Sequence, residues 1–304
     1  YLLGVGILCL LIFKMDLSVV AESLAAVGNQ VFLVFSIAIL WILANTMCIR
    51  TLVQGKIPFT DLMFNQLVGD AYSTIIPMAG LGGEPFKIKH LTNWLDWHTA
   101  SRTEVIDRFI HATTGMLFAS TTTFVTLTFV PIEQAYRLPM IIAAGFFGLV
   151  SIGMVWLALT SAPSKIAGYF LQKLKIVDDY RSEPIPLSRF FLAFSFKFLG
   201  RVFNLLEIYT IFYILGFQPG VIELVAVASM IAISASVFFI IPQGLGVNEA
   251  GISTALAFLG YTASLGIAFG LIRRARMIFW ALFGMALHLA VSVVKKLALS
   301  RASA

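Results

Sequence analysis

Charged residues are scarce in this chain, and their scarcity excludes a soluble globular fold. Asp, Glu, Lys and Arg together make up 12% of the 304 residues, about half the roughly 25% of a typical soluble domain. Hydrophobic residues make up 59%, and the mean hydropathy is +0.93. Several apolar runs approach the ~20 residues that a helix needs to cross a bilayer, so the composition predicts a polytopic membrane protein.

Cysteine is nearly absent as well. Cys9 and Cys48 both lie inside apolar runs, and they form neither a disulfide framework nor a metal-ligand pattern. The four histidines lack ligand spacing, and the sequence contains no Ser-His-Asp, Walker or dinucleotide-binding pattern. We therefore expect no metal, no cofactor and no enzymatic activity.

The net charge of +6 comes from basic residues that sit mainly at the ends of apolar runs. Their expected partners are membrane lipids, through the anionic headgroups of the inner leaflet, and not nucleic acid. The connection 161–188 carries four Lys or Arg residues, which places it on the cytoplasmic side. This orientation predicts an integral, multi-pass protein of the cytoplasmic (inner) membrane with both termini cytoplasmic. The oligomeric state stays open.

The apolar runs predict an all-α polytopic membrane protein with about six full spans and two re-entrant hairpins. Residues 1–13 are interpreted as part of a truncated first span and not as a signal peptide, because no cleavage site follows. The connection 161–188 is expected to be amphipathic and to belong to a single transmembrane domain, 1–304. The other full spans are expected near 31–48, 109–130, 138–160, 189–216 and 276–297.

Two segments nearly repeat each other, IIPMAGLGGE at 75–84 and IIPQGLGVNE at 240–249. Pro removes a backbone donor and Gly weakens a helix, so each segment breaks the apolar stretch before it, 58–77 or 221–241. The shared spacing favours an internal duplication, with repeats at about 31–160 and 189–297; the alternative is two unrelated loop signals. Three pairs share an offset of 165 residues: Pro77 and Pro242, Glu84 and Glu249, and Arg108 and Arg273.

The number of crossings predicts how the two repeats are related. Both broken segments fit the Lys/Arg pattern only if each enters the membrane and returns on the same side. Three crossings lie between them, so the second hairpin must enter from the opposite side, and the repeats are inverted. Arg273, Arg274 and Arg276 then fall on the outer side. Either the topology is wrong there or these arginines are held inside the protein, and we favour the second interpretation.

The two breaks mark the candidate functional site. Non-helical backbone is tolerated at membrane depth only where it is buried in protein or lines a wet cavity. Breaks in corresponding positions of two halves indicate the binding site of a transporter. The residues that form the breaks are Pro77, Gly80, Gly82, Gly83, Pro242, Gly244 and Gly246.

Each break is followed by a carboxylate, which needs a cation or water at membrane depth. The alternative to a role in transport is a structural ion pair that braces each hairpin. The expected pairs are Glu84 with Arg108 or Lys87, and Glu249 with Arg273 or Arg274.

The run 189–216 carries a polar stripe. Lys197, Arg201, Asn204 and Glu207 follow one another at spacings of four, three and three, so they share a helical face that must point into the bundle. Two cations one turn apart suit a phosphate or another anionic headgroup. Alternatively, Arg201 pairs with a carboxylate on a neighbouring helix.

The first broken segment, 58–77, carries a second polar stripe. Gln66, Asp70 and Ser73 share a face, and Asn65 lies beside it. A polar stripe on a hairpin that enters the membrane favours a hydrated cavity, and the alternative is hydrogen bonding between helices.

These motifs resemble those of the lysylphosphatidylglycerol synthase transmembrane-region family. The resemblance rests on NQLVGDAYSTIIPMAGLGGEPFKIKHL, ASRTEVIDRF and IIPQGLGVNEAGISTALAFLGYTASLGIAFGLIRR, and it covers nearly the whole chain. The family often has Asp where this chain has Glu84 and Arg where it has Lys87, which keeps the charge. The motif positions that the resemblance carries over are Pro77, Gly82, Gly83, Asp107, Arg108, Pro242, Gly246, Glu249 and Arg274.

The resemblance implies a flippase-like protein, similar to the flippase half of the bacterial multiple-peptide-resistance factor. We expect it to translocate a lipid with a charged headgroup, of the phospholipid, aminoacylated phospholipid, glycolipid or hopanoid type, through a polar cavity between the repeats. Without a soluble aminoacyl-transfer domain, the chain is not expected to make the modified lipid itself. The alternative is a non-transporting membrane component, and thus a partner, of a lipid-modifying glycosyl- or aminoacyl-transferase.

Overall fold

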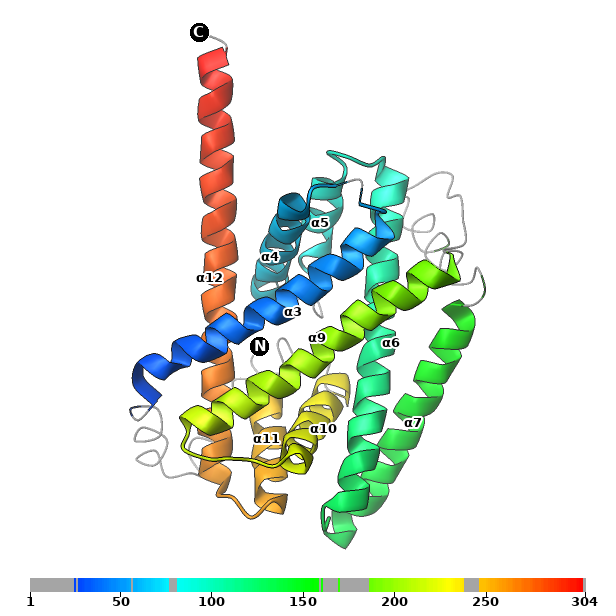
Figure 1. The fold of residues 1–304 in the computed structure, drawn as a ribbon, viewed down its shortest axis with the longest axis vertical. Helices are drawn as coiled ribbons and strands as arrows, with labels where there is room; N and C mark the ends of the chain where they lie inside the picture. Colours follow the sequence, from blue (N-terminus) through cyan, green and yellow to red (C-terminus); the bar gives the residue numbers. More distant parts are fainter. Residues whose placement is uncertain are drawn as a thin grey trace.

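The computed structural model describes residues 25, 27–55, 57–76, 81–158, 160, 169, 186–237 and 246–302, and every regular element in these ranges is a helix (Figure 1). The prediction of an all-α fold is confirmed. The helices are η1 Gly28–Gln30, α3 Val31–Leu52, α4 Phe59–Ile75, α5 Glu84–Leu91, α6 Trp97–Phe129, α7 Gln134–Ala158, α9 Leu187–Ile214, α10 Val221–Val237, α11 Val247–Phe258 and α12 Ala263–Ala302.

Three helical stretches in the described ranges are long and apolar enough to cross a membrane: Gly28–Leu52, Gln134–Ala158 and Ser264–Val294. Two more of the predicted spans, 109–130 and 189–216, fall in α6 and α9. These helices have 33 and 28 residues, which is sufficient length, but polar and charged side chains occur along both. The predicted features at residues 1–13 and Pro77, Gly80, Pro242 and Gly244, with most of the connection 161–188, lie outside the described ranges.

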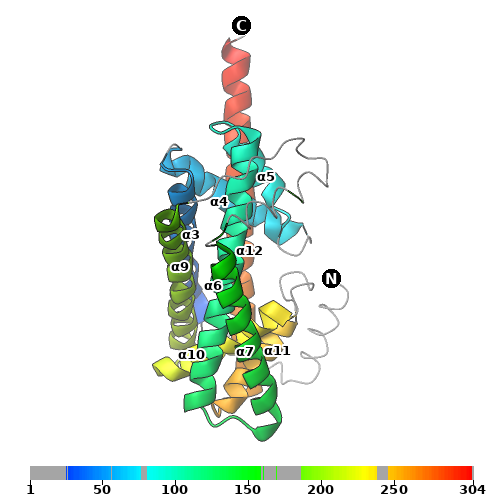
Figure 2. The same cartoon turned by 90° about the vertical axis from the view of Figure 1, so that its right-hand side faces the viewer.

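Two helices that start the predicted repeats, α3 and α9, run side by side across the bundle (Figure 1). α4 and α5 lie toward one end of the molecule, whereas α10 and α11 lie toward the other, as both views show (Figures 1 and 2). α4 packs against α12, and α10 packs against α6. The long helix α12 of the second predicted repeat therefore supports α4 of the first, and the long helix α6 of the first predicted repeat supports α10 of the second.

Apolar packing holds each end of the bundle. Near one end, Ile49 of α3, Leu62 of α4, Leu91 of α5 and Ala100 of α6 form a cluster in which all four side chains are buried. At the other end a larger cluster joins α9, α10, α11 and α12 with part of α3 and α6. Burial of a large apolar side chain stabilises by roughly 1.5–3 kcal/mol, so these clusters fix the helices that carry the polar groups.

Each break is followed by a short helix. α5 starts at Glu84 and ends at Leu91, and α11 starts at Val247 and ends at Phe258. α6 and α12 begin before the predicted spans, at Trp97 and Ala263. Asp96 starts α6 by accepting hydrogen bonds from the Thr99 hydroxyl at 2.6 Å and from the Thr99 backbone N–H at 3.0 Å, and these bonds lower the pKa of its carboxyl group.

Glycine allows the chain to turn at both breaks. A Cβ atom on Gly83 would lie 1.9 Å from the carbonyl oxygen of Gly69, so only glycine lets α5 start this close to α4. The Gly83 N–H also donates to the Ser73 hydroxyl at 3.0 Å, which ties the start of α5 to α4. At the second break Gly246 caps α11 with φ +80°, a left-handed conformation that favours glycine.

Candidate functional site

The first carboxylate, Glu84, is the first residue of α5 and pairs with α6. Arg108 Nε donates to Glu84 Oε1 at 2.8 Å, and Arg108 Nη2 contacts the same oxygen. The partner is therefore Arg108 and not Lys87. A carboxylate in the first turn of a helix also gains roughly 0.3–1 kcal/mol from the helix dipole. The pair fixes α5 against α6, the long helix that follows it.

Lys87, one turn after Glu84, points toward α4. Its side chain is 2% exposed, and its Nζ lies 3.0 Å from Asp70 Oδ1. Gln66 Nε2 donates to the other oxygen of Asp70 at 2.6 Å. The polar stripe predicted on 58–77 therefore makes hydrogen bonds within and between helices in this part of the structure.

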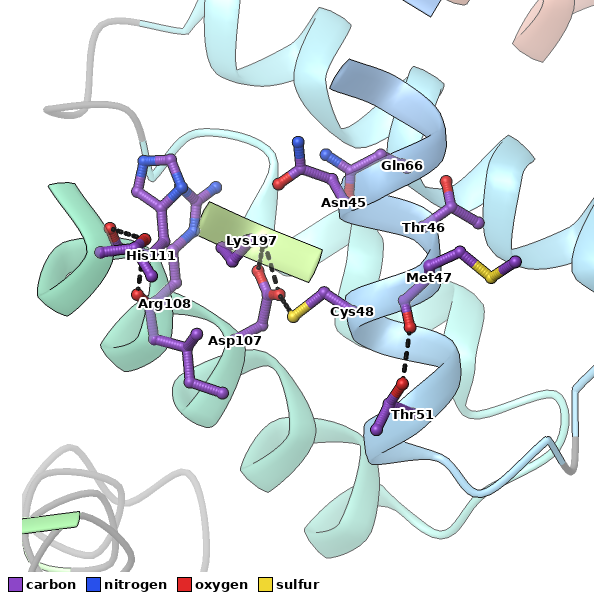
Figure 3. A network of polar contacts seen from close by, with 12 residues as sticks. Asn45, Thr46, Met47, Cys48, Thr51, Gln66, Asp107, Arg108, His111 and Lys197 are labelled. Atoms are coloured by element: carbon purple, nitrogen blue, oxygen red, sulfur yellow. Dashed lines mark hydrogen bonds and ion pairs between the residues drawn. The ribbon is translucent and has the colours of Figure 1, made fainter. Parts of the chain in front are cut away.

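A third ion pair joins α6 to α9. Lys197 Nζ donates to Asp107 Oδ1 at 2.6 Å and to Oδ2 at 2.8 Å, and both side chains are 3% exposed (Figure 3). The thiol of Cys48 on α3 lies 3.3 Å from Asp107 Oδ1. Asp107 is thus the point at which α3, α6 and α9 meet, and Lys197, predicted to contact a headgroup, is bound to a carboxylate in this structure.

The second carboxylate, Glu249, is 1% exposed and is held from two sides. Its Oε2 accepts hydrogen bonds from the Gly246 backbone N–H at 2.9 Å and from Arg274 Nη2 at 2.8 Å. Arg274 Nε lies 2.6 Å from Oε1, so the guanidinium contacts both oxygens. The partner is Arg274 and not Arg273.

The two neighbouring arginines share another buried carboxylate. Arg273 Nε and Arg276 Nε lie 3.1 and 3.2 Å from Glu207 Oε1, and Arg273 Nη2 also donates to Asn204 Oδ1 at 3.3 Å. These pairs, with that of Arg274, explain how three arginines lie in a region that the charge count places on the outer side. They are held inside the protein.

The two breaks correspond only approximately. Glu84 is the first residue of α5, whereas Glu249 is the third residue of α11, which begins at Val247. The arginine that binds each carboxylate also differs by one position from the 165-residue spacing, because Arg274 replaces Arg273. The chemistry of a carboxylate after a break, bound by an arginine of the next long helix, is the same at both.

Arg201, one turn after Lys197, has neutral partners. Its Nη2 lies 3.0 Å from His111 Nε2 and donates to the His111 carbonyl oxygen at 3.1 Å. Across the ranges that the structure describes, no carboxylate forms an ion pair with it, so the alternative of a carboxylate partner is not seen there. Its guanidinium lies over Gly115, where a Cβ would be 3.0 Å from Nη2.

Sequence reasoning missed Glu104 and His111. Glu104 stands four residues before Arg108, a spacing typical of an exposed ion pair on a helix surface, yet its side chain is 1% exposed. Both of its carboxylate oxygens lack a hydrogen-bond donor among the described residues. Asn65, which was predicted, is fully buried, and its side-chain amide also lacks a partner there.

A cavity of about 200 Å³ lies between α3, α4 and α12. Its wall is mostly apolar and includes Trp41, Leu67 and Trp280, but Asp70 and Arg276 also face it. Asp70 belongs to the ion pairs of the first break and Arg276 to those around Glu207, so the cavity touches both groups. Among the described residues no group of three or more His, Cys, Asp or Glu could hold a metal ion.

Residues 1–284 match the family model of the lysylphosphatidylglycerol synthase TM region. This match spans both breaks and every candidate site residue, and it confirms the family resemblance of the motifs. Searches of curated proteins and of solved structures found no match.

Proposed function

Because the chain belongs to the lysylphosphatidylglycerol synthase TM region family, whose name indicates a lipid-related function in the membrane, we propose that it moves a charged-headgroup lipid across the bilayer. The role proposed is transport and not catalysis. The observation that carries the proposal is Arg201, a cation inside the bundle whose partners are a histidine and a backbone carbonyl. A phosphate is the natural third partner of such a guanidinium.

The cavity between α3, α4 and α12 supports the same function. An amphipathic lipid needs a path that offers charge to its headgroup and apolar surface to its chains. The cavity combines both, since Asp70 and Arg276 face it among tryptophan and aliphatic side chains. We propose that headgroups exchange with these ion pairs while the acyl chains stay in the bilayer. The lipid class is a phospholipid, aminoacylated phospholipid, glycolipid or hopanoid type with a charged headgroup.

We further propose that the two halves are inverted repeats with re-entrant hairpins. The pattern of packed helix pairs supports this arrangement. Exchanging α3 with α9, α4 with α10, α5 with α11 and α6 with α12 preserves the packed pairs among these eight helices; for example, α4 packs on α12 as α10 packs on α6. α7, which packs on α6, has no counterpart among the described helices. The two broken segments also lie toward opposite ends of the bundle (Figures 1 and 2).

Labelling of single cysteines tests the inverted arrangement. Asn93 follows α5 and Thr262 follows α11, both in short exposed connections. In a chain without its native cysteines, Asn93→Cys and Thr262→Cys are expected to react with a membrane-impermeant maleimide from opposite sides of the membrane. Labelling of both positions from the same side of sealed, oriented vesicles would show that the halves are not inverted.

Arg201→Gln tests the transport function. A charge without a counter-charge inside the bundle costs free energy, so its removal is expected to leave the melting temperature unchanged or higher. Lipid transfer in reconstituted vesicles is expected to fall at least about tenfold, since one charge-assisted contact is worth roughly 1.5–3 kcal/mol. Arg189→Gln, near the start of the same helix, is the matched control and is expected to transfer lipid at the parent rate.

The two measurements together separate the functional interpretations. A lower melting temperature with unchanged transfer would make Arg201 a structural residue. Wild-type vesicles that bind but do not transfer the lipid would favour the alternative, a membrane component of a lipid-modifying transferase.

A further inference from the structure

Glu104 on α6 is a buried carboxyl group that the proposed function has not used. Its side chain is 1% exposed, and neither oxygen has a hydrogen-bond donor among the described residues. Only one carboxylate oxygen of Glu84 has a hydrogen-bond donor: Arg108 binds Oε1, whereas Oε2 has no donor among the described residues. A buried ionised carboxylate without a donor costs several kcal/mol, so these three oxygens require an explanation.

The two carboxyl groups lie beside each other. Glu104 and Arg108 are one turn apart on the same face of α6, and Arg108 binds Glu84, which brings the Glu84 carboxyl group into contact with that of Glu104. Ionised carboxylates only accept hydrogen bonds, so this contact is repulsive if both groups are charged. If one group is protonated, the same contact becomes a short O–H···O⁻ bond, as in other buried carboxyl pairs.

The charges around Glu104 point to the same protonation state. The nearest cations bind other carboxylates: Lys87 binds Asp70, Arg108 binds Glu84, and Lys197 binds Asp107. Arg201 lies farther along α6, against His111. Among the described residues Glu104 therefore has no cation of its own, and a proton shared with Glu84 removes the repulsion between the two carboxyl groups. The charged and titratable groups of this cluster are Cys48 on α3, Asp70 on α4, Glu84 and Lys87 on α5, Asp107, Arg108 and His111 on α6, and Lys197 and Arg201 on α9.

We propose that Glu84 and Glu104 share one proton and that lipid transfer is coupled to protonation of this pair. The pair with its shared proton carries one negative charge, which Arg108 neutralises. When an anionic headgroup draws Arg108 away, that charge is left without a partner. A second proton from water then binds the free carboxylate oxygen and restores neutrality. One proton is thus taken up for each anionic headgroup bound, and it is released when Arg108 returns to Glu84.

The shared proton can be tested without any lipid. Infrared spectra of the full chain in detergent at neutral pH are expected to show the C=O band of a protonated carboxyl group. Glu104→Gln is expected to remove this band and to keep the parent melting temperature, because Gln reproduces the shape and the donor of a protonated Glu. Glu84→Gln is expected to remove it as well, since the isolated Glu104 then ionises beside Lys87 and Arg108. Glu133→Gln, at an exposed site, is the matched control and is expected to leave the band intact.

The coupling rests on the proposed function and is tested with vesicles that contain a fluorescent anionic phospholipid. An imposed pH gradient is expected to change the transfer rate of the parent and to have no effect on Glu104→Gln. Absence of the carboxyl band in the parent would overturn the shared proton. A band with transfer that ignores the gradient would overturn the coupling alone. A band without any transfer would support the shared proton and overturn lipid transport.

Discussion

Asp107→Asn is expected to lose about 3–5 kcal/mol of unfolding free energy, because it leaves Lys197 charged and unpaired among α3, α6 and α9. The pair is short, at 2.6 and 2.8 Å, and its two side chains are 3% exposed, so water cannot replace the lost carboxylate. The Cys48 thiol, which contacts Asp107 Oδ1, offers no charge in compensation. Thermal or denaturant unfolding of the purified protein in a neutral detergent measures the loss.

A second variant separates the cost of an unpaired charge from the value of the pair. Asp107→Leu combined with Lys197→Met removes both charges and is expected to recover most of the stability, since apolar replacement of a buried pair is often neutral or stabilising. Lys89→Met, at an exposed site, is the control and is expected to be neutral. If the double variant is as unstable as Asp107→Asn, the geometry of the pair and not its charge balance holds the three helices together.

The sequence predicted the elements that depend on local chemistry. Pro and Gly at the two breaks were predicted to interrupt the helices, and the structure starts α5 directly after Gly83 and α11 directly after Gly246. The carboxylate after each break and the arginine of the following long helix were predicted as partners as well. Which of two adjacent arginines binds could not be predicted, because one residue turns a helix by about 100° and only packing fixes that rotation.

The long polar start of α6 was harder to predict. Residues 97–108 contain Arg102, Glu104, Asp107 and Arg108, which suggests an exposed segment when judged by hydropathy. In the structure Glu104 and Asp107 face the interior, where Asp107 binds a cation from another helix. Hydropathy scores each residue alone, so it cannot detect that two charges far apart in sequence neutralise each other. The same limitation hid Glu104, whose spacing from Arg108 fits a surface pair.

These ion pairs also explain how an apolar helical bundle keeps so many charged side chains in its interior. Each break places a carboxylate at the start of a short helix, and the next long helix supplies the arginine. The remaining pairs connect helices on either side of the breaks, from α4 to α5, from α6 to α9 and from α9 to α12. In the proposed function, a headgroup that competes for one pair therefore acts on contacts between helices, and this is how we propose that binding shifts the bundle between conformations.

Glu207→Gln is expected to have the second large effect, because one carboxylate holds two arginines. Glu207 is 5% exposed, and its Oε1 lies 3.1 Å from Arg273 Nε and 3.2 Å from Arg276 Nε. Gln keeps the shape but not the charge, so two guanidinium groups lose their counter-charge at once. We expect a loss of at least about 3–5 kcal/mol in a neutral detergent, which separates α12 from α9.

The Glu207→Gln variant also tests whether an anionic lipid headgroup reaches Arg276. Arg276 faces the cavity, so a lipid phosphate can reach it when Glu207 no longer binds it. Anionic phospholipid is therefore expected to raise the melting temperature of Glu207→Gln more than that of the parent. Glu133→Gln, changed at an exposed site, is the control and should melt as the parent does in neutral detergent and in anionic phospholipid. A melting temperature equal to the parent in neutral detergent would show that the two arginines do not depend on Glu207. Equal stabilisation of both proteins by anionic lipid would show that the cavity does not admit a headgroup to Arg276.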